Sequence, residues 1–375
     1  MKIEFYRHNL NEADKNEVRK VLDSLFLTTG EWTKQFEEKF AAYLGVPYVA
    51  GVSSCTNALE MALKYYNIGP GDQVITTPMS FIATANAIET CGAQPVFVDV
   101  EPETGNIDVG RIEAALTDRT KAIIPVHLYG QMCDMPELRR VADTYSLKII
   151  EDAAHCIEGT RDGIRVGALG DISCFSFYAT KSLTCGEGGA IACHDADIND
   201  WMRKARLHGM SKNAADRYSK IYEHYDMEFL GFKCNLNNIH AALLVHQIDR
   251  LDQICSARQQ IAARFDEAFD TESGLKRPAI LPNSFHPRHL YTLWVNPAKR
   301  DLFMHELQQS GIGVAVNFRA IHLMSYYRKK YGYQPGDFPN CEYIGNSTIT
   351  LPLYPLLKDE EINWIIKEVK RVLHK

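Results

Sequence analysis

The chain has 375 residues, of which 46% are hydrophobic and 23% charged, with a net charge of −6 at pH 7. This length predicts two domains, a large one over residues 1–245 and a small one over residues 246–375. The mild net acidity gives no electrostatic reason to expect nucleic acid as a partner. No run of 18 apolar residues occurs, so no segment is expected to span a membrane.

The N-terminus and the cysteines together predict a cytoplasmic protein. Residues 1–11 lack the apolar core of a secretory signal. The ten cysteines, among them Cys91 and Cys341, are scattered without the spacing of metal ligands. We therefore expect buried, reduced thiols rather than a disulfide framework, and no metal site.

Short β-rich runs alternate with amphipathic helical patterns over the first two-thirds of the chain. Most of the runs are continuously apolar, as in a parallel sheet covered by helices on both faces. The predicted strands are 74–77, 95–100, 122–127, 147–151, 172–177 and 189–193. The predicted helices between them include 57–66, 82–90, 108–116 and 135–145. This alternation predicts an α/β fold with a mostly parallel central sheet flanked by helices.

The pattern changes after about residue 231 and predicts a smaller α+β unit. A long helix over 238–269 is expected to lead into it. Strands are then predicted at 291–295 and 313–318, and helices at 302–310 and 359–373.

A carboxylate and a lysine follow two of the predicted strands. Asp152 ends an apolar run, and Lys181 comes just after the strand at 172–177, ahead of a glycine-rich turn at 186–189. Ligands of α/β sheets bind at such strand ends. A lysine amine near a buried carboxylate suits pyridoxal phosphate, because the amine forms the Schiff base and the carboxylate keeps the pyridine nitrogen protonated.

Hydroxyls and backbone amides upstream are suited to a phosphate. Residues 52–58 form a small polar turn that opens a helix, where free N–H groups bind anions. Ser176 can add a hydroxyl from the segment that carries the lysine. Phe81 follows another strand and offers a ring for stacking on a flat cofactor.

Five stretches in this order resemble the DegT/DnrJ/EryC1/StrS family of sugar aminotransferases, over nearly the whole chain. They are 51–59, 76–86, 151–155, 175–189 and 231–243. The resemblance implies a fold-type I pyridoxal-phosphate-dependent transferase that works as a homodimer with active sites shared between subunits.

The resemblance also implies roles for single residues. Lys181 would be the Schiff-base lysine and Asp152 the partner of the pyridinium, and both would be catalytic. His155 would lie near the ring hydroxyl, and Phe81 would stack on the ring. The phosphate would be held by Ser54, Cys55, Thr56 and Ser176.

An asparagine near residue 234 serves the neighbouring subunit's phosphate site in the family. It occurs there at either of two positions, which Lys233 and Asn235 occupy here. We assign the role to Asn235, with Lys233 as a substrate or phosphate contact. Many relatives have histidine in place of Tyr178 and glycine or alanine in place of Cys55, and these departures bear on specificity rather than on the class of reaction.

The expected reaction is amination of a nucleotide-linked, UDP-type 4-keto sugar with L-glutamate as the amino donor. Within the family the chain resembles the UDP-4-amino-4-deoxyarabinose aminotransferase type in residues 27–30, 207–209, 216–218 and 311–322. Substrate contacts are expected from Thr29, Tyr178, Lys233, Arg319 and His322. The alternatives are a pyridoxal-dependent sugar dehydratase and a non-catalytic cofactor-binding sensor; the intact Lys181 favours transamination.

Several of these residues also have simpler interpretations. Asp152 could be a helix cap, since Asp before Ala-Ala is a common start signal. His155 could be a core or surface histidine. Core packing and ring stacking are equally compatible with Phe81. A surface role is open for Arg319 and His322.

Overall fold

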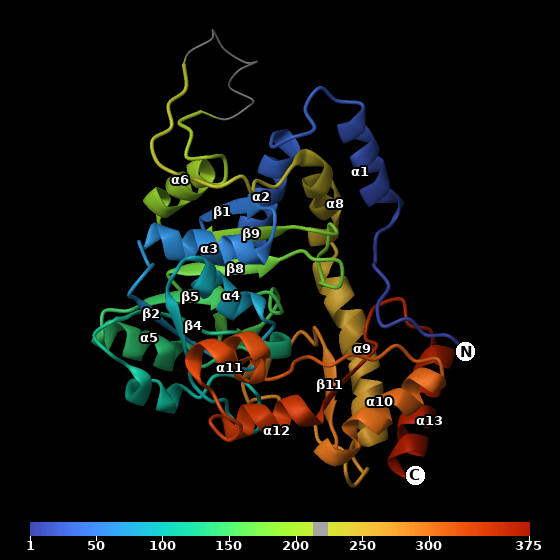
Figure 1. Cartoon of the computed structure of the whole chain (residues 1–375). Helices are drawn as coiled ribbons and strands as arrows, with labels where there is room; N and C mark the ends of the chain where they lie inside the picture. The colour runs from blue at the N-terminus through green and yellow to red at the C-terminus, as the bar shows by residue number, and fades with distance from the viewer. Residues whose placement is uncertain (213–223) are drawn as a thin grey trace.

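The computed structural model of the chain describes residues 1–212 and 224–375. Residues 216–218, one of the stretches that resemble the UDP-4-amino-4-deoxyarabinose aminotransferase type, lie outside the described residues. The described part contains one large sheet with helices on both faces, followed by a smaller helical and β unit (Figure 1).

The central sheet has seven strands in the order β1-β9-β8-β5-β4-β2-β3. Five neighbouring strands from β8 to β3 pair in parallel, whereas β9 is antiparallel to both β1 and β8. The α/β prediction is confirmed. The strands are β1 (Tyr48–Val52), β2 (Gln73–Thr76), β3 (Gln94–Phe97), β4 (Thr120–Ile124), β5 (Lys148–Asp152), β8 (Ile172–Ser176) and β9 (Gly189–Cys193).

Both faces of this sheet are buried because successive side chains of a strand point to opposite sides. On β5, Ile149 joins the core on one face and Ile150 the core on the other. The first core is closed by α2, α5 and α8, and the second by α3, α4 and α6. The helices of the two layers are α2 (Glu31–Leu44), α3 (Cys55–Tyr65), α4 (Ala83–Thr90), α5 (Met135–Thr144), α6 (Ala196–Ala205) and α8 (Asn238–Ile248).

The six predicted strands of this region correspond to β2, β3, β4, β5, β8 and β9. The structure adds β1, α2 and an N-terminal helix, α1 (Glu12–Leu22), which the sequence pattern did not predict. The helix predicted over 108–116 is wrong: two short 3-10 turns, Val109–Arg111 and Glu113–Ala115, take its place. Gly110 disfavours a continuous helix there, and its N–H donates instead to the Asp108 carboxylate at 3.1 Å.

The helix predicted over 238–269 is two helices, α8 and α9 (Leu251–Phe269). The break falls at Arg250, whose guanidinium donates to the buried carboxylate of Asp14 on α1 at 3.0 Å. Helix α9 then runs from the large sheet to the C-terminal unit (Figure 1). The division of the chain at residues 245/246 remains a prediction.

The C-terminal unit has its own apolar core around a two-stranded antiparallel ribbon, β11 (Tyr291–Trp294) and β12 (Thr348–Leu351). Ile3 belongs to this core, so the N-terminus packs against the end of the chain (Figure 1). The helices here are α10 (Arg300–Gln309), α11 (Ser325–Tyr331), α12 (Pro339–Ser347) and α13 (Asp359–Leu373). Three further short strands, β6 (Thr160–Arg161), β7 (Ile164–Arg165) and β10 (Ser284–Phe285), pair with one another.

The strand predicted over 313–318 is wrong. Only Ala315 forms a bridge, to Thr350. The start of the segment pairs instead with the N-terminus, where the Gly313 N–H donates to the Ile3 carbonyl at 2.8 Å. The far end of the segment, at Asn317, lines the cavity described below.

None of the described helices is both long and apolar enough to cross a membrane. All ten cysteines are buried and none forms a disulfide.

Candidate active site

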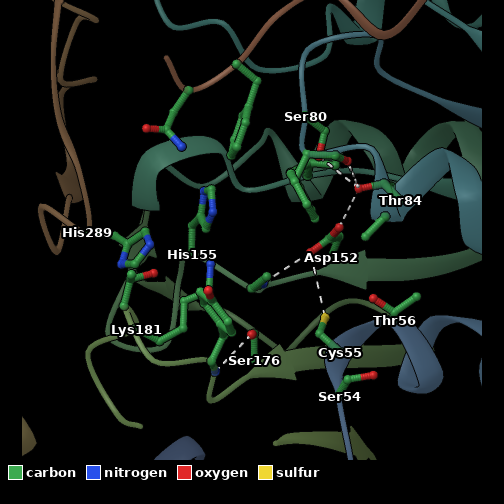
Figure 2. Close-up of a pocket in the computed structure, with 18 of the residues that line it drawn as sticks. Ser54, Cys55, Thr56, Ser80, Thr84, Asp152, His155, Ser176, Lys181 and His289 are labelled. Atoms are coloured by element: carbon green, nitrogen blue, oxygen red, sulfur yellow. Dashed lines mark hydrogen bonds between the residues drawn. The ribbon is translucent and has the colours of Figure 1, made fainter. Parts of the chain in front are cut away.

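A cavity of about 540 Å³ lies at the carboxyl ends of the parallel strands (Figure 2). Its volume is in the range of sites for small molecules and cofactors. The large sheet supplies side chains that follow β1, β2, β5 and β8. The C-terminal unit closes the cavity with His289, Leu290, Asn317 and Phe318.

The structure brings Lys181 and Asp152 to this one cavity (Figure 2). Asp152 is the last residue of β5, which pairs in parallel with β8 through Cys174. Lys181 follows β8 in a turn that is closed by a 2.9 Å hydrogen bond from its N–H to the Tyr178 carbonyl. Two neighbouring strand ends therefore place an amine and a carboxylate at the same opening.

Burial changes the protonation of both groups. It lowers the pKa of Lys181 to about 8, although the nearby Cys55 and Asp152 act in the opposite direction. It also raises the pKa of Asp152, against the effects of a hydrogen bond from Thr84, the Ala154 N–H and the Lys181 charge. Lys181 thus has a sizeable neutral fraction near neutral pH, the form that acts as a nucleophile or general base.

The N-terminus of α3 forms another wall of the cavity. Ser54 caps the helix by accepting from the Asn57 N–H at 3.1 Å. The N–H groups of Cys55 and Thr56 open the helix, where no preceding turn supplies an acceptor, so they can bind an anion. The buried Ser176 hydroxyl lines the same cavity.

Gly189 allows this helix end to lie directly against the sheet. A Cβ at Gly189 would come within 2.5 Å of the Ser54 carbonyl carbon and 2.6 Å of the Cys55 nitrogen. Any side chain there would displace the first turn of α3. The position of the amides therefore depends on a residue that the sequence pattern marked only as part of a turn.

His155 is neutral, and its ring position is fixed by neighbours. Its Nδ1 accepts from the Tyr129 N–H at 3.3 Å, which leaves the proton on Nε2 as a donor. Burial and the Lys181 charge hold the pKa of His155 well below its usual range. Its ring packs against those of His289, at 4.5 Å, and Phe318, at 5.6 Å.

The structure places the Phe81 ring at the cavity and not in the core. The side chain is 57% exposed and lines the cavity, with its ring 5.9 Å from that of Phe318. Tyr178 is also exposed at the rim. Both rings are thus available to a bound molecule.

Thr29, Lys233 and Asn235 form a separate group that does not line this cavity. The Asn235 amide donates to the Thr29 hydroxyl at 2.7 Å, and the Lys233 amine donates to the Asn235 amide oxygen. This polar group lies partly open at the surface of the chain.

The structure does not bring Arg319 or His322 to the cavity lining. Arg319 is exposed beside Phe318. His322 is fully buried, with Nε2 3.1 Å from the Glu342 carboxylate and its ring 4.7 Å from that of Phe338. The His322 side chain therefore lies in the interior of the C-terminal unit, and its substrate contact remains a prediction.

Several lining residues were not predicted as site residues. Thr84 and Ser80 lie within the quoted stretch 76–86, and their hydroxyl spacing of four residues on a helix start was an available signal. His289 and Asn317 come from the C-terminal unit, where no motif marked them. Among residues 1–212 and 224–375, no group of three or more His, Cys, Asp or Glu side chains could hold a metal ion.

Comparison with known proteins gives the same assignment as the geometry. The model of the DegT/DnrJ/EryC1/StrS aminotransferase family matches residues 8–370. The chain belongs to this family. The spore coat polysaccharide biosynthesis protein SpsC of Bacillus subtilis is 41% identical over 370 residues, which cover 97% of this chain and 95% of that protein.

Solved structures of aminotransferases superpose over the whole chain. The sugar aminotransferase Spr1654 of Streptococcus pneumoniae, described as putative and solved in its PMP form, has a TM-score of 0.93 at 31% identity, covering 100% of this chain and 99% of that one. Helicobacter pylori PseC, an aminotransferase involved in pseudoaminic acid biosynthesis, has a TM-score of 0.93 at 28% identity, with both chains covered in full. The family resemblance and the fold expected from the sequence are thus confirmed.

Proposed function

We propose that this pyridoxal-phosphate-dependent sugar aminotransferase acts on a UDP-linked 4-keto sugar, with L-glutamate as the amino donor. The observation that carries the proposal is the presence of Lys181 and Asp152 in one cavity, with the N-terminus of α3 on its wall. The related Spr1654 has been solved in PLP and PMP forms, which supports the choice of cofactor.

The residues of the cavity fit this cofactor. Bound pyridoxal phosphate supplies an aldehyde that takes up the amino group and a protonated pyridine that withdraws electrons from the reacting carbon. Asp152 would hold the proton on the pyridine nitrogen, and the His155 Nε2–H would donate to the ring oxygen. The N–H groups of Cys55 and Thr56, with the hydroxyls of Ser54 and Ser176, would hold the phosphate.

Lys181 would have two roles in succession. Its amine would hold the cofactor until the donor takes its place, and it would then carry a proton between the donor's α-carbon and the cofactor. A pKa of about 8 suits both roles, because each needs an amine that gains and loses a proton near neutral pH. Phe81, exposed at the opening, would cover one face of the ring and exclude water.

A homodimer would explain the polar group of Thr29, Lys233 and Asn235. The family resemblance assigns an asparagine at this place to the phosphate of the neighbouring subunit. Leu25 and Leu230, close in the chain to Thr29 and Lys233, are 79% and 87% exposed, and we propose that a partner subunit covers them. We propose that Asn235 and Lys233 complete the partner's site.

The Bacillus relative, a spore coat polysaccharide biosynthesis protein, supports synthesis of an amino sugar for a polysaccharide. The buried, unpaired thiols are consistent with the reducing cytoplasm, where we place the reaction.

The test is spectroscopic. Purified protein with pyridoxal phosphate should be yellow, lose that absorbance with L-glutamate and regain it with a UDP-linked 4-keto sugar. Asp152→Asn should keep the cofactor but lose most of the rate. Mass spectrometry of the product distinguishes an amino sugar from the deoxy sugar of a dehydratase. A yellow protein whose colour does not change with glutamate would instead be a non-catalytic cofactor-binding protein.

A further inference from the structure

A chain of hydrogen bonds joins Ser80, Thr84 and Asp152 in the wall of the cavity (Figure 2). The Ser80 and Thr84 hydroxyl oxygens are 2.8 Å apart, and the Thr84 hydroxyl lies 2.7 Å from the Oδ2 of Asp152. All three side chains are buried, at no more than 5% exposure. These contacts are therefore largely shielded from solvent.

The directions of the hydrogens follow from the chemistry of the groups. An ionised carboxylate can only accept, so the single hydrogen of the Thr84 hydroxyl points to Asp152. The Thr84 oxygen must then accept from the Ser80 hydroxyl. Two hydroxyl dipoles are thus aligned toward the same carboxylate oxygen, an arrangement in which each bond strengthens the other.

The other oxygen of Asp152 is less engaged. Oδ1 accepts from the Ala154 N–H at 3.2 Å and lies 3.9 Å from the Cys55 sulfur, a weak contact. Thr84 therefore holds Oδ2 firmly and leaves Oδ1 with a free lone pair. The two hydrogen bonds, one to each oxygen, fix the plane of the carboxylate.

A purely structural role for Thr84 is the simpler alternative. At the start of α4 a threonine hydroxyl often bonds the backbone of the preceding turn, and the Phe81 carbonyl is within reach. That oxygen is 3.4 Å away, compared with 2.7 Å for Asp152. The shorter, charge-assisted bond is the stronger one.

We propose that Thr84, with Ser80 behind it, is a positioning residue that keeps Asp152 ionised and oriented toward the pyridine nitrogen. This rests on the function proposed above. Without the hydroxyl, the buried carboxylate would become more basic and would compete for the proton that the pyridine nitrogen needs.

The other titratable groups that face Asp152 come from separate elements. They are Lys181 in the turn after β8, His127 after β4, Cys174 on β8 and Cys55 on α3. Burial raises the pKa of both thiols well above their usual range, so they remain neutral. Among the groups that favour the ionised form and so oppose burial, the hydrogen bond from Thr84 has the largest effect on the pKa of Asp152.

The experiment compares Thr84→Val, which replaces the hydroxyl with a methyl group, with Thr84→Ser, which keeps the hydroxyl. Thr76→Val is the matched control, because Thr76 is also buried and donates at 2.8 Å, but to the Ile124 carbonyl. In the cofactor-free full-length protein, the Asp152 carboxyl is titrated by NMR of ¹³C-labelled aspartate, with Asp152→Asn to assign the signal. A hydrogen bond to a charged group corresponds to a shift of about one to two pKa units.

Thr84→Val should raise the pKa of Asp152 by that amount, while Thr84→Ser and Thr76→Val should leave it unchanged. With ¹⁵N-labelled pyridoxal phosphate bound, the pyridine nitrogen signal should move toward the unprotonated form in Thr84→Val alone. Equal titrations in Thr84→Val and wild type, or an equal shift in Thr76→Val, would overturn the proposal. The cofactor-free titration is independent of the proposed reaction, which fails separately if wild type shows no colour change with glutamate.

Discussion

The cavity of Lys181 and the surface group of Asn235 are two halves of the predicted site, and they differ in completeness. The first is enclosed by its own chain, with groups from four strand ends and from the C-terminal unit. The second lies at the surface with Thr29 and Lys233 as its neighbours and shares no cavity with Lys181. The difference indicates which parts of the chemistry one chain provides and which part we assign to a second copy.

Loss of the lysine amine should have the largest effect on the enclosed half. Lys181→Ala removes both the attachment point and the proton carrier, so the rate of transamination should fall about a thousandfold or more. Lys148→Ala is the control, since Lys148 is exposed at the start of the same strand that ends in Asp152. Steady-state assays with glutamate and a UDP-linked 4-keto sugar measure the change, and normal turnover in Lys181→Ala would refute the scheme.

The next effect concerns the wall that should hold the phosphate. Gly189→Ala would push a methyl group into the first turn of α3, so cofactor affinity should fall about tenfold to a hundredfold, with a loss of about 1–3 kcal/mol in stability. Gly69→Ala is a suitable control, because its added Cβ would be 3.4 Å from the nearest atom, the Cys91 carbonyl oxygen. Titration of the cofactor by fluorescence measures the affinity, and thermal unfolding measures the stability. An unaltered affinity would show that the N-terminus of α3 does not bind the phosphate.

The pH dependence of cofactor uptake tests the environment of Lys181. Only the neutral amine attacks the aldehyde, so the rate of reconstitution should rise with pH. The midpoint of this rise should lie near the pKa of about 8. From pH 8 to pH 7 it should fall about fivefold, as the neutral fraction drops. Stopped-flow absorbance gives the profile. A midpoint near 10, as for an exposed lysine, would show that the amine is not buried.

Subunit mixing tests the surface half directly. Lys181→Ala and Asn235→Ala subunits are each expected to be weakly active alone. In a mixed dimer with shared sites, one site regains both residues, so an equal mixture should recover about a quarter of the wild-type activity. Each variant refolded with itself is the control. No recovery on mixing would mean that Asn235 acts within its own chain.

The smallest effect on activity is expected at His322. His322→Ala removes a buried group bonded to Glu342, so stability should fall by about 1–3 kcal/mol while kcat stays within about twofold. Denaturant unfolding measures the stability and steady-state kinetics measure kcat. A large fall in kcat with normal stability would show that His322 acts in the reaction.

The sequence was most informative where function depends on residues close together in the chain. Asp152 and Lys181 each follow a buried apolar strand, and parallel pairing of β5 with β8 brings them to one edge. His289 and Asn317 are more than a hundred residues from Lys181 and reach the cavity only through the packing of the C-terminal unit. No local pattern encodes such contacts.

A contact between distant segments explains the error at residues 313–318. These residues have the composition of a strand, but hydrogen bonds to Ile3, at the other end of the chain, take the place of a sheet partner. His322 is buried against Glu342 and Phe338, and the motif that marked it as a substrate contact carries no information about this packing.

Borohydride reduction followed by peptide mass spectrometry tests the central claim most directly. Reduction fixes the cofactor to whichever amine holds it. The protein loaded with pyridoxal phosphate should carry the added mass on Lys181. In Lys181→Ala no other lysine should be modified to a comparable extent. A modified lysine elsewhere, or no modified peptide in a yellow protein, would contradict the account.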